Sequence, residues 1–281
     1  MTMKINHKDT AEIGGEAPHR PGGIKFHYLL TGEDGARDNF MLALVDFKDE
    51  YYTPRHRHNF EQVRVGLEGS YEWAPGTAQE AGTIGYFCEG TYYAQKGTGH
   101  SRHLLLQVAG PSGEGYMSHQ QLREHGRKLQ QKGEFHDGIY TWRDEQDRKH
   151  NKDGFEAVWE DVNGREIKYP KPRYEQPVLM RPENFDYVPV SAAPGVYERL
   201  LGRFNERGLL IKQVKMDAGS TLEVGGSPQS LLFYAISGSG SANGKAWRPE
   251  SAFQVERNET VTIEADEAAE FHVLGLPVFS D

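Results

Sequence analysis

The stretch TPRHRHNFEQVRVGLEG, residues 53–69, carries the pattern on which the fold prediction rests. His56 and His58 lie two positions apart, and Gln62 and Arg64 continue the same parity. Because residues two apart in a strand share a face, an extended segment would turn all four side chains to one side. The opposite face would carry Glu61, Val63 and Val65. The pattern therefore predicts a strand segment with a polar inner face that bears histidines.

Two imidazoles on one face form half of a metal-binding site. Imidazole is the commonest protein ligand of transition metals, including Fe, Mn, Ni and Zn. The alternative is that His56 and His58 are solvated histidines in an arginine-rich stretch of surface. We favour a site for one divalent ion of this group, whose identity the residues leave open.

The surrounding sequence, from about residue 25 to residue 107, consists of short strand-like segments separated by Gly, Pro and Asp turn signals. Their regular spacing is typical of a β-sandwich or barrel. The predicted strands are Phe40–Phe47, Gln62–Leu67, Ser70–Trp73, Thr83–Phe87 and His103–Val108.

The character changes between residues 110 and 177. His119–Gln131 is polar and compatible with a helix, Trp142–Lys152 is dense in charge, and residues 169–177 read as a loop, YPKPRYEQP. Strand patterns then return in LLIKQVKM, SLLFYAISG, AFQVE and TVTIEA. We therefore predict an N-terminal barrel over residues 1–110, a partly helical connector over 111–177 and a second barrel over 178–281.

Composition excludes several classes of function. The formal net charge is -9 and the basic residues are scattered, which argues against a nucleic-acid partner. No run of about 18 apolar residues is present, and the N-terminus lacks the apolar region of a secretory signal, so we predict a cytoplasmic protein without a membrane partner. The single cysteine, Cys88, excludes an intrachain disulfide.

The motif in residues 53–69 resembles the first motif of the cupin superfamily, G-x5-H-x-H-x3–4-E-x6-G. His56, His58 and Gly69 match it, Gln62 takes the place of the acidic ligand, and Glu50 takes the place of the leading glycine. The resemblance implies an all-β fold of two tandem double-stranded β-helix (jelly-roll) barrels with the metal site in the first.

The second cupin motif, G-x5-P-x-G-x2-H-x3-N, is similar to GTIGYFCEGTYYAQKG, residues 82–97. Here Cys88 replaces the proline and Tyr93 replaces the histidine ligand. The resemblance therefore implies His56, His58 and Gln62 as ligands and leaves the fourth position open. Tyr93 could fill it as a phenolate or bind a metal-bound water, or His103 could turn inward as a third imidazole.

The second half lacks such a motif. Aligning Gly238 with Gly69 places Gly225, Ser227 and Leu231 where the first half has His56, His58 and Gln62. None of the three is a usual metal ligand. We expect a structural role for this barrel and no metal, and we expect His272 to be an ordinary strand residue.

Arg64 is the most informative residue that is not a predicted ligand. A guanidinium inside a barrel needs an anionic partner, either an internal carboxylate or a bound substrate. We predict a metal-dependent cupin that acts on a small oxygenated or carboxylated metabolite, with Arg64 and Tyr93 as catalytic residues and dioxygenase-like chemistry favoured. The alternatives are a binding protein without turnover, and a lyase, decarboxylase or isomerase. The resemblance also allows a homodimer.

Overall fold

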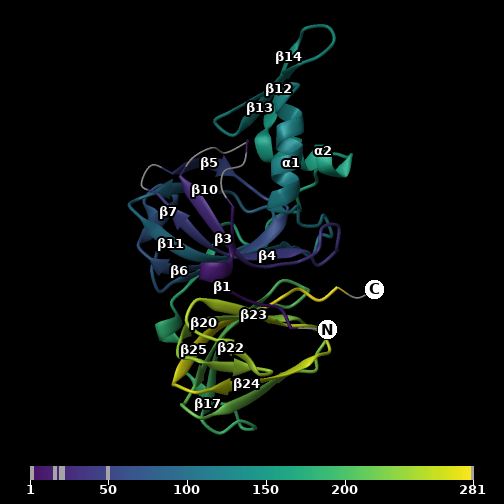
Figure 1. Ribbon diagram of the computed structural model, residues 1–281. Helices are drawn as coiled ribbons and strands as arrows, with labels where there is room; N and C mark the ends of the chain where they lie inside the picture. The colour runs from purple at the N-terminus through teal and green to yellow at the C-terminus, as the bar shows by residue number, and fades with distance from the viewer. Residues whose placement is uncertain (1–2, 15–17, 19–22, 49–50, 280–281) are drawn as a thin grey trace. The chain divides into compact units, whose positions relative to one another are not determined.

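The computed structural model describes residues 3–14, 18, 23–48 and 51–279. Glu50 lies outside these residues. The described chain is built mainly of strands, and Figure 1 shows them as two groups that differ in colour because they come from the two halves of the sequence. Both groups have the two-sheet construction of a jelly roll. The prediction of two tandem barrels is therefore confirmed.

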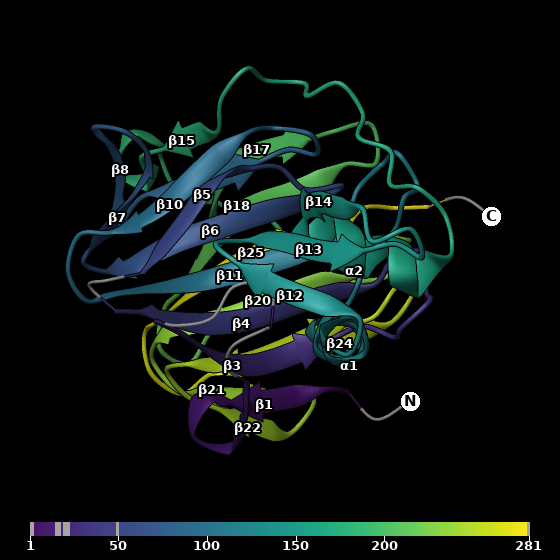
Figure 2. The same cartoon turned by 90° about the horizontal axis from the view of Figure 1, so that it is seen from above.

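The first barrel pairs a seven-stranded antiparallel sheet, in the order β15-β9-β6-β11-β4-β3-β2, with a four-stranded sheet, β5-β10-β7-β8 (Figure 2). The strands of the larger sheet are β2 (Glu12–Gly14), β3 (Ile24–Thr31), β4 (Phe40–Phe47), β6 (Phe60–Glu68), β9 (Ile84–Phe87), β11 (Ser101–Ala109) and β15 (Val178–Met180). Those of the smaller sheet are β5 (Tyr52–His56), β7 (Ser70–Ala74), β8 (Thr77–Glu80) and β10 (Tyr93–Gly97). All five strands predicted here are present.

Strand β6 lies inside the larger sheet, between β9 and β11, and is covered on both faces. Glu61, Val63 and Val65 alternate with Gln62 and Arg64 along β6, as predicted, but their face is buried as completely as that of Arg64. A central strand covered on both sides loses the simple alternation of buried and exposed residues.

The predicted connector contains more structure than the sequence indicated. Helix α1 (His119–Gln130) begins at Ser118, whose hydroxyl accepts from the Gln121 backbone N–H in a capping box. A three-stranded sheet follows, made of β12 (Gly133–His136), β13 (Ile139–Arg143) and β14 (Lys149–Asp153), and then helix α2 (Gly154–Asn163). The hairpin between β12 and β13 turns at Asp137-Gly138, both with positive φ.

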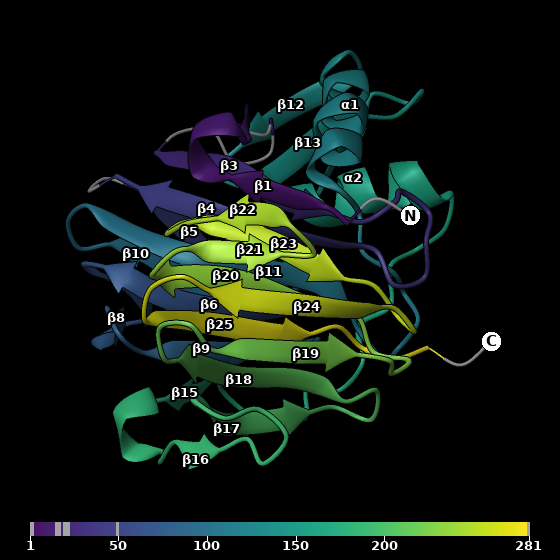
Figure 3. The same ribbon diagram turned by 60° about the horizontal axis from the view of Figure 1, so that its bottom comes forward.

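The second barrel repeats the same plan. Its sheets have the orders β1-β23-β20-β25-β18-β17-β16 and β19-β24-β21-β22, and Figure 3 shows the smaller one in yellow and green. The strands are β1 (Ile5–His7), β16 (Val188–Pro189), β17 (Val196–Phe204), β18 (Leu209–Met216), β19 (Thr221–Gly225), β20 (Leu231–Ser237), β21 (Gly240–Ala242), β22 (Lys245–Trp247), β23 (Ser251–Val255), β24 (Thr260–Ala265) and β25 (Ala269–Gly275). The four predicted strand patterns correspond to β18, β20, β23 and β24.

The described chain divides into two compact units whose bounds differ from the predicted domains. One unit is made of Ile13–Phe26 and Gly32–Leu179, so the segment expected to be a connector belongs with the first barrel. The other unit is made of Met1–Glu12, His27–Thr31 and Met180–Asp281. The N-terminal strand β1 pairs with β23 and so belongs to the second barrel. This long-range pairing cannot be predicted from a local sequence pattern.

Candidate functional site in the first barrel

His56 and His58 converge inside the first barrel, with 5% and 7% of their surface exposed. Strand β5 ends at His56, so His58 lies beyond the strand, yet the two ring centroids are only 4.9 Å apart. The Nδ1 atom of His56 lies 2.7 Å from the backbone oxygen of Pro54. A carbonyl only accepts, so His56 Nδ1 carries the proton and Nε2 carries the lone pair that a metal would use.

Tyr93 stands beside this pair. It opens strand β10 and is the register partner of His56 on β5. Its ring centroid lies 4.5 Å from that of His56 and 6.0 Å from that of His58. The structure therefore brings together the two histidines and the tyrosine that replaces the third histidine of the family motif.

Gln62 and Arg64 project from β6 into the same space and are joined by hydrogen bonds. Arg64 Nη2 donates to Gln62 Oε1 at 2.9 Å, and Gln62 Nε2 donates to the Tyr93 hydroxyl at 2.6 Å. Gln107 donates to the same Gln62 oxygen at 3.4 Å. The resemblance to the first cupin motif implied the Gln62 oxygen as a metal ligand. In the structure this oxygen faces the guanidinium cation of Arg64.

Arg64 carries a buried positive charge surrounded by neutral groups. Its side chain is 4% exposed, and no carboxylate of the described residues forms an ion pair with it. Besides Gln62 it donates to the Tyr93 hydroxyl at 3.4 Å, and the Gln95 amide, with its oxygen turned toward Arg64, accepts from Nη2 at 2.8 Å. Burial acts to lower the pKa of Arg64, but the phenols of Tyr71 and Tyr93 outweigh it and the pKa is raised. The group is a permanent cation.

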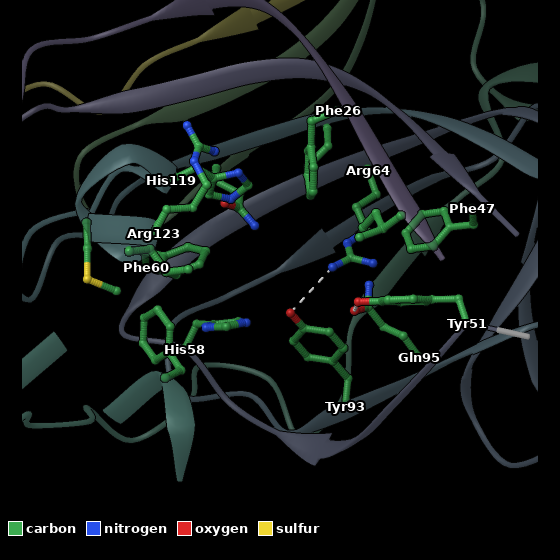
Figure 4. Close-up of a pocket in the computed structure, with 16 residues that line it drawn as sticks. Phe26, Phe47, Tyr51, His58, Phe60, Arg64, Tyr93, Gln95, His119 and Arg123 are labelled. Carbon is green, nitrogen blue, oxygen red and sulfur yellow. Dashed lines mark hydrogen bonds between the residues drawn. The ribbon is translucent and has the colours of Figure 1, made fainter. Parts of the chain in front are cut away.

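His58, Arg64, Tyr93 and Gln95 line a cavity of about 90 Å³ (Figure 4). Figure 4 shows Arg64, Tyr51 and Gln95 on one side of it and His58, His119 and Arg123 on the other. The lining is otherwise largely apolar and contains no Asp or Glu among the described residues: Ile24, Phe26, Phe47, Tyr51, His58, Phe60, Arg64, Tyr93, Gln95, Leu105, Gln107, Met117, His119, Leu122, Arg123 and Phe155. In a protein of net charge -9, this cavity is basic.

Helices α1 and α2 close one side of the cavity, which sequence reasoning missed. His119, Leu122 and Arg123 come from the first turn and a half of α1, and Phe155 comes from α2. Burial and the nearby Arg123 lower the pKa of His119 to about 4, so this imidazole is neutral at pH 7. The only local signal was the capping box at Ser118, which predicts where a helix starts but not what it covers.

His103 lies apart from His56 and His58. It lies on β11 and is 1% exposed, but its ring packs against Phe47 and Tyr71, and its Nε2 lies 3.3 Å from the Ser101 hydroxyl. Among the described residues, no cluster of three or more His, Cys, Asp or Glu side chains is placed to hold a metal. His103 therefore does not form such a cluster with His56 and His58, and its ring packs against Phe47 and Tyr71 in another part of the barrel interior.

A second buried polar cluster lies on the opposite face of β6. Arg173 Nη1 is 3.2 Å from Glu61 Oε1 and 3.8 Å from Glu89 Oε2, and both carboxylates are fully buried. Glu89 also accepts from the Ser112 backbone N–H and hydroxyl. In contrast to Arg64, Arg173 has carboxylate partners within the protein.

The donor set fits a divalent metal ion at His56, His58 and Tyr93. The observation that supports it is the Pro54 contact, which orients His56 so that Nε2 is a lone-pair donor, together with the convergence of three donor side chains. Gln62 Oε1 accepts from Arg64, and the Tyr93 hydroxyl accepts from both Gln62 and Arg64. Two imidazoles and a phenol would leave coordination positions for a substrate.

No family model matches the chain, and no curated protein matches it in sequence. Solved structures do match its fold. A provisional dioxygenase from Nostoc punctiforme PCC 73102 aligns over 99% of this chain and 87% of its own, with a TM-score of 0.65 and 9% identity.

Two further matches span almost the whole chain. A bacterial pirin from Escherichia coli, solved with nickel(II), aligns over 99% of this chain and all of its own, with a TM-score of 0.57 and 10% identity. A variant of the oxalate decarboxylase of Bacillus subtilis aligns over 98% of this chain and 77% of its own, with a TM-score of 0.57 and 12% identity. At these identities the likeness concerns the fold. Neither helix in the described part of the chain is long and apolar enough to cross a bilayer.

Proposed function

We propose that this protein, a cupin with two tandem barrels, binds a small organic carboxylate inside its first barrel and transforms it beside a divalent metal ion. One observation carries the proposal: the guanidinium of Arg64 is buried, lines a cavity and has only neutral partners among the described residues. A charge removed from water at such cost needs a compensating anion. A ligand that enters the cavity can supply it.

A carboxylate suits this cavity better than other anions. The planar guanidinium matches a carboxylate with two parallel hydrogen bonds, and the apolar lining by Phe26, Phe47 and Leu105 suits a short carbon skeleton. His119 is neutral at pH 7 and can donate or accept a hydrogen bond at the far side. A small hydroxy- or oxo-carboxylate would satisfy both ends.

His56, His58 and Tyr93 would hold the metal ion, which would supply Lewis acidity and a binding position for dioxygen. Arg64 would anchor the carboxylate next to these residues, and the cavity walls would exclude water. Dioxygenase-like chemistry, with dioxygen as the co-substrate, remains our first choice over lyase, decarboxylase or isomerase chemistry. The two-imidazole donor set and the fold shared with the provisional dioxygenase support this choice.

A second candidate is a binding protein without turnover. It is favoured by one feature of the cavity lining, which has no Asp or Glu among the described residues and hence no carboxylate to act as general base. Turnover measurements separate the two candidates.

Carboxylate binding is tested by thermal shift and calorimetry with a panel of C2 to C6 carboxylates and their neutral amides. We expect carboxylates alone to stabilise the protein, and Arg64→Gln to abolish this effect. Arg143→Gln is the matched control because Arg143 is an exposed arginine of the same chain. Equal stabilisation of the parent and Arg64→Gln would refute the proposed anchor.

The metal and the chemistry are tested together. Elemental analysis of protein purified without chelator should give close to one metal ion per chain, and His56→Ala/His58→Ala should lose it. Oxygen uptake by the Fe(II)-loaded protein is then followed with each carboxylate that binds. Metal binding without uptake or product would favour the binding-protein candidate over the enzyme.

A further inference from the structure

We propose that the neutral side chain of Gln62 determines the charge of the ligand that the cavity accepts. This inference rests on the proposed function, because it concerns the same cavity. An amide stands where the family motif has a carboxylate, and it holds Arg64 in place without neutralising it. Gln62 is thus a positioning residue that acts through Arg64.

The geometry shows how Gln62 does this. Its Oε1 accepts from Arg64 Nη2 at 2.9 Å while its Nε2 donates to the Tyr93 hydroxyl at 2.6 Å. The amide is 1% exposed and is itself held by Gln107, which accepts from the Tyr116 hydroxyl at 3.0 Å. An amide accepts from a cation and donates to a phenol oxygen at the same time without carrying charge.

A carboxylate at this position would change the electrostatics of the cavity. At 2.9 Å from the guanidinium it would form a charge-assisted hydrogen bond, and the adjacent cation would keep it ionised. Arg64 would then have an internal counter-ion, and the cavity would no longer favour an anion. The amide of Gln95, on the other side of Arg64, also accepts from the guanidinium without neutralising its charge.

The test compares Gln62→Glu with Gln62→Met, which is neutral and of similar size. For each protein, calorimetry at pH 7.5 measures the dissociation constants of the best carboxylate from the panel and of its amide. We expect Gln62→Glu to bind the carboxylate at least about 100-fold more weakly than the parent, with little change for the amide. Gln62→Met should keep a preference for the carboxylate, because Arg64 is still uncompensated.

The ratio of carboxylate to amide affinity is the decisive readout, because damage to packing would weaken both ligands alike. Gln95→Glu provides an independent variant should Gln62→Glu fold poorly, and the same loss of preference is expected. An unchanged ratio in a folded glutamate variant, or an equal loss of preference in Gln62→Met, would overturn the inference. A parent protein that binds no carboxylate would overturn the proposed function, and the inference with it.

Discussion

The two barrels have the same two-sheet arrangement of strands but differ in the polarity of the side chains in their interiors. In the first, Arg64 on β6 stands opposite Gly85 on β9 and Leu105 on β11. In the second, the equivalent register position is Phe233 on β20, opposite Phe253 on β23 and Val273 on β25. Arg64 brings a buried charge into the first barrel, whereas the stacked rings of Phe233 and Phe253, with centroids 4.9 Å apart, fill the corresponding position of the second with apolar side chains.

The other buried side chains of the two barrels differ in polarity in the same way. The hydrophobic cluster of the second barrel includes Trp247, Phe271 and Ile263, and the buried polar side chains of that half, such as Gln213 and His272, are not part of it. Gly225 and Leu231 occupy the positions that correspond to His56 and Gln62, so that interior offers a metal no donor there. A jelly roll can therefore fold around either polar or apolar interior side chains. Polar interior side chains indicate a function, because burying them costs stability.

The largest expected effect on stability comes from placing an arginine in the second barrel at the position that corresponds to Arg64. Phe233→Arg would bury a cation among phenylalanines, without the amides and phenols that surround Arg64. We expect it to lower the free energy of unfolding by more than about 4 kcal/mol, measured by urea denaturation. Phe233→Leu is the control and should cost about 1–2 kcal/mol. A mild effect of Phe233→Arg would show that the amides and phenols around Arg64 are not needed to bury an arginine.

A smaller effect separates the two buried arginines of the first barrel. Arg173→Gln removes the cation that faces the buried Glu61 and Glu89 carboxylates and should destabilise by about 2 kcal/mol. Arg64→Gln, measured without ligand, should change stability by less than about 1 kcal/mol, because the lost hydrogen bonds are offset by relief of an uncompensated charge. Thermal and urea unfolding measure both. A large loss in Arg64→Gln would make Arg64 a structural residue.

The smallest expected effect on stability concerns a buried histidine in each barrel. Burial lowers the pKa of His103 and of His272 to about 3, with a further contribution from Arg64 and Arg199 respectively. Unfolded histidine titrates near pH 6.5, so the unfolded chain binds protons first as the pH falls. Each histidine should leave stability unaffected above about pH 6.5 and cost about 1 kcal/mol by pH 5.5.

Calorimetric unfolding between pH 7.5 and 5.5 measures this loss. His103→Gln and His272→Gln should each flatten the pH dependence, since glutamine does not titrate. The same slope in the parent and both variants would show that other groups cause the acid sensitivity.

Much of the fold could be predicted from local sequence. Strands β4, β18 and β24 have the predicted bounds, because short apolar runs between turn residues determine strands locally. The β12–β14 sheet was missed although Asp137-Gly138 is a hairpin signal, because its strands are short and β14 is highly charged. The placement of β1 in the second barrel was unpredictable, since three residues pair with a partner nearly 250 positions away by number.

For the site, the sequence alone predicted that His56, His58, Gln62, Arg64 and Tyr93 belong together, from the shared parity of the first four and from the resemblance of residues 82–97 to the second cupin motif. Only the tertiary structure decided their roles. It directed the Gln62 oxygen to Arg64, turned His103 toward Tyr71, and placed His119 and Arg123 of α1 over the cavity. The reason is physical: strand spacing determines which side chains share a face, but the partner of a buried charge depends on contacts between segments far apart in the chain.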